Sequence, residues 1–224
     1  AETWDALRER LQQGCRNASG TMAASLPPIF DSQQDYRQWK AEKDRFDIPK
    51  GEWKDGMNEL WIGIDSGSTT TKVVAIDRDE HLLYTYYAPN QGDPVGAVRE
   101  GLNRLSAQAG GRELRIAGSC STGYGEDLIR AAFNLDHGII ETIAHYASAR
   151  KITPDVSFIL DIGGQDMKAM FVKGGALYRM ELNEACSSGC GAFLETFARS
   201  LGYTAEQFAQ EACRAKAPCD LGTR

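Results

Sequence analysis

Cysteine, proline and histidine are scarce in this sequence. Its 224 residues include 6 cysteines, 7 prolines and 3 histidines. Six scattered cysteines are too few for a secreted disulfide scaffold, so we expect reduced thiols or metal ligands. No run approaches the roughly 18 uninterrupted apolar residues of a membrane helix, and no signal-peptide pattern opens the chain. We therefore expect a cytoplasmic protein with no membrane partner.

Basic residues are outnumbered by acidic ones. Lys and Arg total 25 against 31 Asp and Glu, which gives a formal net charge of −6. Non-specific nucleic-acid binding depends on a positively charged patch, and no basic cluster interleaved with aromatic residues occurs here. The composition therefore argues against a nucleic-acid partner.

The sequence around Asp65 predicts two strands joined by a polar turn. The apolar run 60–64 indicates a buried strand that ends on Asp65, and residues 72–76 indicate a second strand. Asp65 could hold Mg²⁺ through water, while hydroxyl groups and close glycine backbone suit phosphate oxygens. The candidate phosphate-binding residues are Gly67, Ser68, Thr69, Thr70 and Lys72. A plain tight turn would explain one such hairpin as well.

A second copy of the same pattern favours the functional interpretation. Residues 159–168 repeat the apolar pair, then an aspartate (Asp161), a glycine two places on (Gly163) and a lysine seven places on (Lys168). Both copies continue as a strand, a polar turn and a further strand. Such an internal repeat predicts two lobes that face one nucleotide, with Asp65 and Asp161 confronting each other across a shared cleft.

The remaining pattern predicts an arm and two lobes. We expect residues 1–57 to be a helical connector with helices near 4–15 and within 31–47, residues 58–152 the first lobe, and residues 153–224 an incomplete second lobe. Strands are expected at 60–65, 71–77, 82–88, 113–118, 138–140, 156–161, 166–172 and 176–182. Helices are expected at 94–108, 126–133 and 141–151, and after residue 191, where Phe193, Leu194, Phe197 and Leu201 would form a core stripe.

Other polar residues have a structural and a functional interpretation. Residues 121–125, including Gly123, follow a predicted strand and suit either a ligand loop or a plain turn. Glu141 is expected to cap a helix start, and His145 to pack or hydrogen bond. Cys186 and Cys190 flank a Gly/Ser turn before a helix. They could be thiolates that hold an iron–sulfur cluster, or small buried residues that allow a tight turn.

Taken together, residues 63–72, 121–125, 161–166 and 183–186 resemble the activators of 2-hydroxyacyl-CoA dehydratases. That family includes ATPase subunits of benzoyl-CoA reductases and belongs to the acetate kinase, sugar kinase, heat-shock chaperone and actin superfamily. The resemblance implies an α/β fold class with duplicated ribonuclease-H-like lobes, the actin-like ATPase fold, of which the second lobe is truncated at the C-terminus.

The resemblance also implies a function. By this resemblance the protein would be an ATPase that binds ATP or ADP with Mg²⁺ and donates electrons to a 2-hydroxyacyl-CoA dehydratase-like partner. A homodimer would hold one 4Fe-4S cluster with two cysteines from each subunit. Carried over to this sequence, the catalytic residues would be Asp65, Asp161 and Gln165, and the nucleotide-binding residues Gly67, Ser68, Thr69, Thr70, Lys72, Gly123, Gly163, Gly164 and Asp166.

The sequence departs from the family at its cluster ligands. Cys186 falls on one family ligand, but the other lies in a Glu-x-x-Cys-His pattern that here has Ala144. Either Cys190 substitutes for the missing ligand, or this copy has lost the cluster. The family's adenosine-contacting glycine turn would lie beyond Arg224. A small-molecule kinase with Asp166 as general base and a nucleotide-gated docking module without a cluster are the alternatives.

Overall fold

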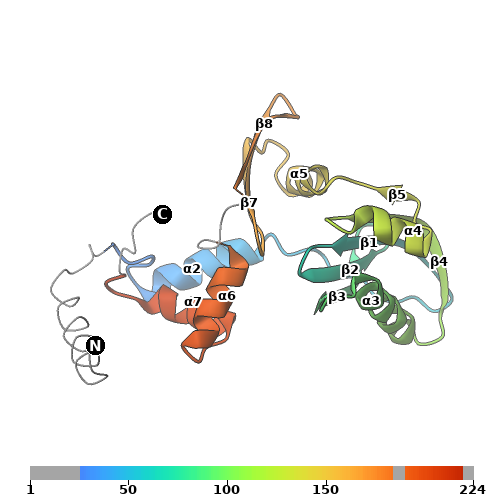
Figure 1. Ribbon diagram of the computed structural model, residues 1–224, viewed down its shortest axis with the longest axis horizontal. Helices are drawn as coiled ribbons and strands as arrows, with labels where there is room; N and C mark the ends of the chain where they lie inside the picture. The colour runs from blue at the N-terminus through green and yellow to red at the C-terminus, as the bar shows by residue number, and fades with distance from the viewer. Residues whose placement is uncertain (1–25, 184–189, 219–224) are drawn as a thin grey trace, which may run out of the picture. The chain divides into compact units, whose positions relative to one another are not determined.

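The computed structural model describes residues 26–183 and 190–218, which form two compact units (Figure 1). One unit is Arg45–Ala192, and the other combines the described parts of Ala1–Asp44 and Phe193–Arg224. Among the described residues, no helix is both long enough and apolar enough to span a bilayer. The lobe boundaries expected from the sequence remain a prediction.

The larger unit contains a five-stranded mixed sheet in the order β3-β2-β1-β4-β5. The strands are β1 (Met57–Ser66), β2 (Thr70–Ile76), β3 (Leu82–Pro89), β4 (Glu113–Thr122) and β5 (His137–Gly138). β1, β2 and β3 are antiparallel neighbours, whereas β4 runs parallel to β1 and β5 parallel to β4. β4 is longer than predicted because its pairing with β1 continues to Asp65 and Thr122.

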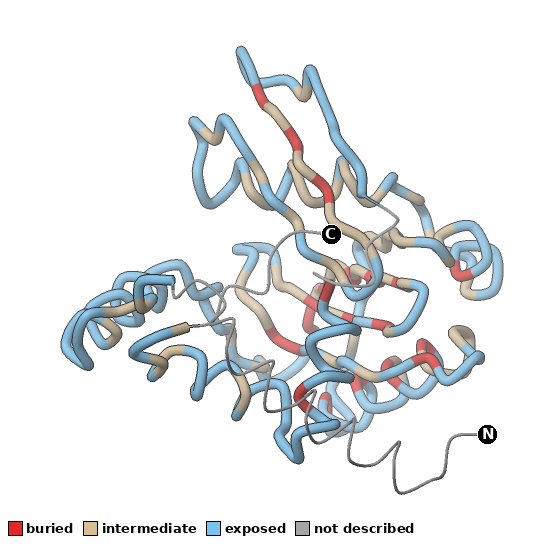
Figure 2. The backbone as a smooth tube through the Cα atoms, turned by 60° about the vertical axis from the view of Figure 1, so that its left-hand side comes forward, coloured by how far each residue is buried: buried red, intermediate tan, exposed pale blue. Residues whose placement is uncertain are grey.

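A three-stranded antiparallel sheet in the same unit repeats the first three strands. It consists of β6 (Phe158–Ile162), β7 (Met167–Lys173) and β8 (Ala176–Asn183), and helix α5 (Glu141–Ile152) precedes it. Figure 2 shows that buried positions recur along one of its strands, and within these three strands they belong to β7 alone. The predicted duplication of the strand–turn–strand pattern is therefore confirmed in the fold.

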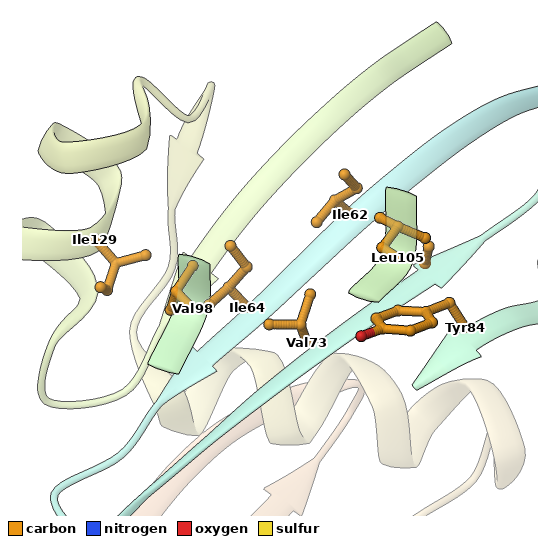
Figure 3. Packing of buried hydrophobic residues seen from close by; sticks show 8 residues of the cluster. Ile62, Ile64, Val73, Tyr84, Val98, Leu105 and Ile129 are labelled. Atoms are coloured by element: carbon orange, nitrogen blue, oxygen red, sulfur yellow. The ribbon is translucent and has the colours of Figure 1, made fainter. Parts of the chain in front are cut away.

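Two helices cover one face of the five-stranded sheet. Helix α3 (Pro94–Ala109) begins after Asp93, whose side chain accepts a hydrogen bond from the backbone of Gly96, and α4 (Glu126–Phe133) follows β4. Figure 3 shows strand and helix side chains meeting in one apolar cluster, made by Ile62, Ile64, Val73, Ala75, Tyr84, Val98, Leu105 and Ile129. Burial of these side chains stabilises the sheet edge that carries the first polar turn.

The smaller unit is helical. It contains α2 (Gln33–Asp44), α7 (Ala205–Arg214) and most of α6 (Gly191–Ser200). α7 starts with a capping box, in which the Thr204 side chain accepts from the Gln207 backbone and the Gln207 side chain accepts from the Thr204 backbone. The expected core stripe of α6 is wrong in its burial, because Phe193, Leu194, Phe197 and Leu201 are 41 to 53 % exposed. Instead, the Phe197 ring stacks on Phe193 and contacts Phe208 edge-on.

Ile129 offers a test of the apolar core between the five-stranded sheet and helices α3 and α4. Its side chain is fully buried on α4, whereas Leu128 on the same helix is 53 % exposed. We expect Ile129→Ala to lower the free energy of unfolding by about 2–5 kcal/mol, because it leaves a cavity. Leu128→Ala should change it by less than about 0.5 kcal/mol. Urea denaturation of both variants measures the difference, and equal losses would contradict the assigned core.

Candidate phosphate-binding site

The first polar turn joins β1 to β2 and is fixed by its backbone. The Gly67 N–H donates to the Thr70 carbonyl at 2.9 Å, which closes the turn. Asp65 and Lys72 are opposite each other in the strand register, and Lys72 Nζ lies 2.7 Å from Asp65 Oδ2. Because Lys72 is half exposed, this ion pair contributes at most about 1 kcal/mol. The exposed Ser68 and Thr69 form the tip of the turn.

Gly123, which was predicted from its position after a strand, lies directly against Asp65. Its φ is +87°, and a Cβ placed on it would lie 2.7 Å from Asp65 Oδ1 and 2.6 Å from the Ser66 carbonyl oxygen. The Gly125 N–H donates to that carbonyl at 2.9 Å. The β4–α4 turn therefore touches the first polar turn at backbone distance, and only glycine fits there without strain.

Two side-chain oxygens at this contact have no hydrogen-bond partner among the described residues. Asp65 Oδ1 and Ser66 Oγ are buried and accept no hydrogen bond from the part of the chain that the structure describes. A buried polar atom without a partner costs free energy unless water or a ligand satisfies it. A carboxylate oxygen of this kind suits a hydrated Mg²⁺, so the donor chemistry fits the predicted role of Asp65.

Asn90 supports the first turn and was not recognised in the sequence. It is 6 % exposed at the end of β3. Its Nδ2 donates to the Gly67 carbonyl at 2.7 Å, its Oδ1 accepts from the Thr71 hydroxyl at 2.6 Å, and its N–H donates to the Thr69 carbonyl at 2.8 Å. These contacts fix the turn from behind. No local pattern predicts them, because they join residues about 20 positions apart in the sequence.

The second polar turn repeats the first in backbone but not in charge. The Gly163 N–H donates to the Asp166 carbonyl at 2.9 Å, and Asp161 is opposite Lys168 in the register. Lys168 is only 6 % exposed, and its Nζ lies 2.9 Å from Asp166, 3.3 Å from Glu141 and 3.6 Å from Asp161. One buried ammonium is thus shared by three carboxylates.

These contacts set the protonation state of Lys168. Burial of the ammonium lowers its pKa, but the hydrogen bond to Asp166 and the charge and hydrogen bond of Glu141 raise the pKa by more, so it lies well above its ordinary value. Lys168 is therefore charged at neutral pH. The stability that it contributes is fully present below the ordinary lysine pKa and is lost only as the pH rises through the raised value.

Helix α5 contributes two side chains to the second turn. Glu141 begins the helix as predicted, but the expected cap is wrong, because the N-cap residue is Ile140 and no side chain caps the helix. The Glu141 carboxylate instead reaches Lys168, and His145 Nδ1 lies 3.3 Å from Asp161 Oδ2. The ligand atoms of Glu141, His145 and Asp161 lie within 4.8 Å of one another, as metal ligands would. Lys168 already supplies a cation to two of them, so we do not assign a metal here. Asp77, Asp79 and His81 also converge, but the Asp77 carboxylate is used by the Asp79 and His81 N–H groups.

The two turns adjoin each other. A Cβ placed on Gly164 would lie 3.3 Å from Thr69 Oγ1. The Gly163 and Gly164 carbonyls accept from Gly191 and Ala192 at 3.0 Å, so the start of α6 is tied to the second turn. Gln165 is exposed beside them. The structure thus brings residues of both predicted phosphate loops side by side, while their catalytic roles remain predictions.

Of the two predicted cysteine ligands, the structure describes Cys190 alone. Cys186 lies outside the described residues. Cys190 is 1 % exposed immediately before α6. Ala144, at the position of the family's second cluster ligand, is in the first turn of α5, and its side chain has no atom that could bind iron.

Gly123 and Gly92 make a matched pair for testing the contact with Asp65. Both have a positive φ, but no described atom lies within 4 Å of a Cβ on Gly92. Alanine at either position incurs about 1–3 kcal/mol of backbone strain. We expect Gly123→Ala to destabilise the protein further than Gly92→Ala, and to disturb the first turn, because only there would the Cβ overlap a carbonyl and a carboxylate. Thermal unfolding and amide hydrogen exchange of residues 65–71 measure this, and equal effects of both changes would refute the contact.

Comparison with known proteins assigns the chain that carries this site to a family. Residues 62–218 match the BadF/BadG/BcrA/BcrD ATPase family. The chain is 35 % identical over 147 residues to the uncharacterized protein YjiL of Escherichia coli K12, covering 65 % of this chain and 54 % of that protein. It is 30 % identical over 148 residues to the (R)-2-hydroxyglutaryl-CoA dehydratase activating ATPase of Acidaminococcus fermentans, covering 65 % and 55 %. It therefore spans about half the length of these relatives.

A solved structure supports the fold. The activator of the 2-hydroxyisocaproyl-CoA dehydratase from Clostridium difficile with bound ADPNP has a TM-score of 0.63 and 25 % identity, covering 73 % of this chain and 60 % of that one. This likeness confirms the predicted α/β class with actin-like ATPase lobes. The family match covers most of the chain, and the chain belongs to the BadF/BadG/BcrA/BcrD ATPase family.

Proposed function

We propose that the protein is the nucleotide-binding module of an activator for a 2-hydroxyacyl-CoA dehydratase-like partner, and that it binds and hydrolyses ATP. The observation that carries the proposal is the meeting of two polar turns, each with an aspartate at a strand end and a lysine across the register. The family is one of ATPases, and a relative is named as a dehydratase activating ATPase.

The residues present suit the chemistry of phosphate hydrolysis. Gly67, the exposed Ser68 and Thr69, and Gly163 and Gly164 would bind phosphate oxygens through hydroxyl and backbone groups. Asp65 would hold Mg²⁺ through water with its buried Oδ1, and the bound ion would neutralise charge on the phosphates.

The other carboxylate would act on water. Asp161, with Gln165, would orient a water molecule toward the γ-phosphorus. A P–O bond forms to this water as the bond to the β-phosphate oxygen breaks, ADP leaves, and Asp161 accepts the proton. Asp166 is less suited to serve as a kinase's general base, because Lys168 lies 2.9 Å from its carboxylate.

Asp65→Asn and Asp161→Asn separate these two roles. We expect Asp161→Asn to lower kcat by about 100-fold or more while the affinity for a non-hydrolysable ATP analogue stays within about threefold, since a proton acceptor contributes to turnover. Asp65→Asn should raise the Mg²⁺ concentration needed for half-maximal activity. Steady-state phosphate release and equilibrium nucleotide binding measure both effects. Unchanged turnover in both variants would contradict the proposed site.

We further propose that nucleotide state controls low-potential electron transfer through a 4Fe-4S cluster at a homodimer interface, with Cys186 as a ligand. Thiolate ligands next to a helix N-terminus suit such a cluster. Cys190 does not fit: at 1 % exposure its sulfur is enclosed by its own chain, and a shared cluster needs ligands that face the other subunit. We therefore derive no step through Cys190.

Iron analysis distinguishes the electron donor from a docking module. After anaerobic reconstitution, we expect iron and a visible absorption band in the wild type and their loss in Cys186→Ala. Because Ala144 offers no ligand, retention of iron in Cys190→Ala would mean that neither cysteine position of the family supplies the second ligand of each subunit. Wild-type protein that binds nucleotide but no iron would favour the nucleotide-gated docking module, which the buried Cys190 and Ala144 also suit. Sedimentation of the reconstituted protein tests the dimer.

A further inference from the structure

Two side chains of α5 meet the second polar turn from the same side of the helix. Glu141 and His145 are four residues apart, so they project in the same direction. Glu141 Oε2 lies 3.3 Å from Lys168 Nζ, and His145 Nδ1 lies 3.3 Å from Asp161 Oδ2. Both contacts are at least half buried, because the four side chains are 7 to 35 % exposed. Helix α5 thus contacts both Asp161 and Lys168, which are opposite each other in the strand register.

Three carboxylates compete for the ammonium of Lys168. Asp161 Oδ2 is buried and accepts no hydrogen bond from any described residue, and Lys168 Nζ lies 3.6 Å away. Nζ is closer to Asp166, at 2.9 Å, and to Glu141, at 3.3 Å. In the first turn, where no such helix contact is present among the described residues, Lys72 binds its aspartate at 2.7 Å. The presence of Asp166 and Glu141 therefore coincides with an Asp161 whose lysine is drawn away from it.

Structural needs alone do not account for these contacts. Asp166 already supplies a charge partner for Lys168, so Glu141 is not required to neutralise the buried ammonium. The helix is also attached to the same sheet by a hydrogen bond from the Tyr146 hydroxyl to the Gly175 carbonyl at 2.5 Å.

We propose that Glu141 and His145 are positioning residues for Asp161. Glu141 holds Lys168 away from Asp161, which leaves Oδ2 able to accept a proton. His145 Nδ1 lies 3.3 Å from the same oxygen without a hydrogen bond to it, and it orients the carboxylate when it turns to donate. The inference rests on the proposed function, in which Asp161 accepts the proton of the attacking water. When Glu141 loses its charge, Lys168 moves to Asp161 and occupies the oxygen that the reaction uses.

Glu141→Gln in the 224-residue chain tests the proposed role of Glu141. Glu100→Gln is the control, because Glu100 forms an exposed ion pair with Arg104 on α3. We expect Glu141→Gln to lower kcat for ATP by about tenfold to 100-fold, the effect of a small misplacement, with KM within about twofold. Glu100→Gln should match the wild type. A merely structural role for Glu141 would lower the melting temperature without this separation of kcat from KM.

His145 supplies the second and independent test. His145→Ala removes the donor and should lower kcat by about tenfold, whereas His145→Asn keeps an amide N–H near the place of Nδ1 and should restore most of the rate. This pair decides the matter if Glu141→Gln fails to fold. Equal kcat in His145→Ala and His145→Asn, or in Glu141→Gln and Glu100→Gln, would overturn the inference alone. A wild-type chain without turnover would overturn the proposed function, and the inference with it.

Discussion

The register of two hairpins determines the geometry of this site. In each hairpin an aspartate at the end of the first strand is directly opposite a lysine of the second strand, Asp65 with Lys72 and Asp161 with Lys168. Side chains alternate between the faces of a strand, so a slip of one residue would exchange the faces of Asp65 and the buried Ile64. Apolar burial by α3 and α4 on one face therefore fixes the carboxylate on the other.

The same register produces two different electrostatic environments. Within the described part of the chain, Lys72 is exposed and has one acidic partner, whereas Lys168 is buried among three carboxylates. The first turn is supported by Asn90 through neutral hydrogen bonds, and the second by the ion pairs of Lys168 with Asp166 and with Glu141 of α5. The first turn is therefore held by uncharged hydrogen bonds, whereas in the second the surroundings of Asp161 are charged. The difference between the two turns arises from the residues that surround each hairpin and not from the repeated strand–turn–strand pattern.

Local sequence pattern predicted the strands and most helices, because alternation and helical periodicity are set by which side chains must be buried. It also brought Gly123 to the site, since a turn after a parallel strand lies at the same edge as the strand ends. Pattern could not predict Asn90, or the contacts of Glu141 and His145 with the second turn, which depend on segments that meet only after folding. The stripe on α6 was predicted correctly as a helix face but not in its burial, because helical spacing does not specify what covers the face.

The central claim is that both turns bind one nucleotide. A crystal structure of the protein with Mg²⁺ and a non-hydrolysable ATP analogue tests it most directly. We expect phosphate oxygens within hydrogen-bonding distance of residues 67–70 and of residues 163–164, with the carboxylates of Asp65 and Asp161 on either side of them. An analogue whose phosphates contact one turn only, with the other aspartate on a separate surface, would contradict it.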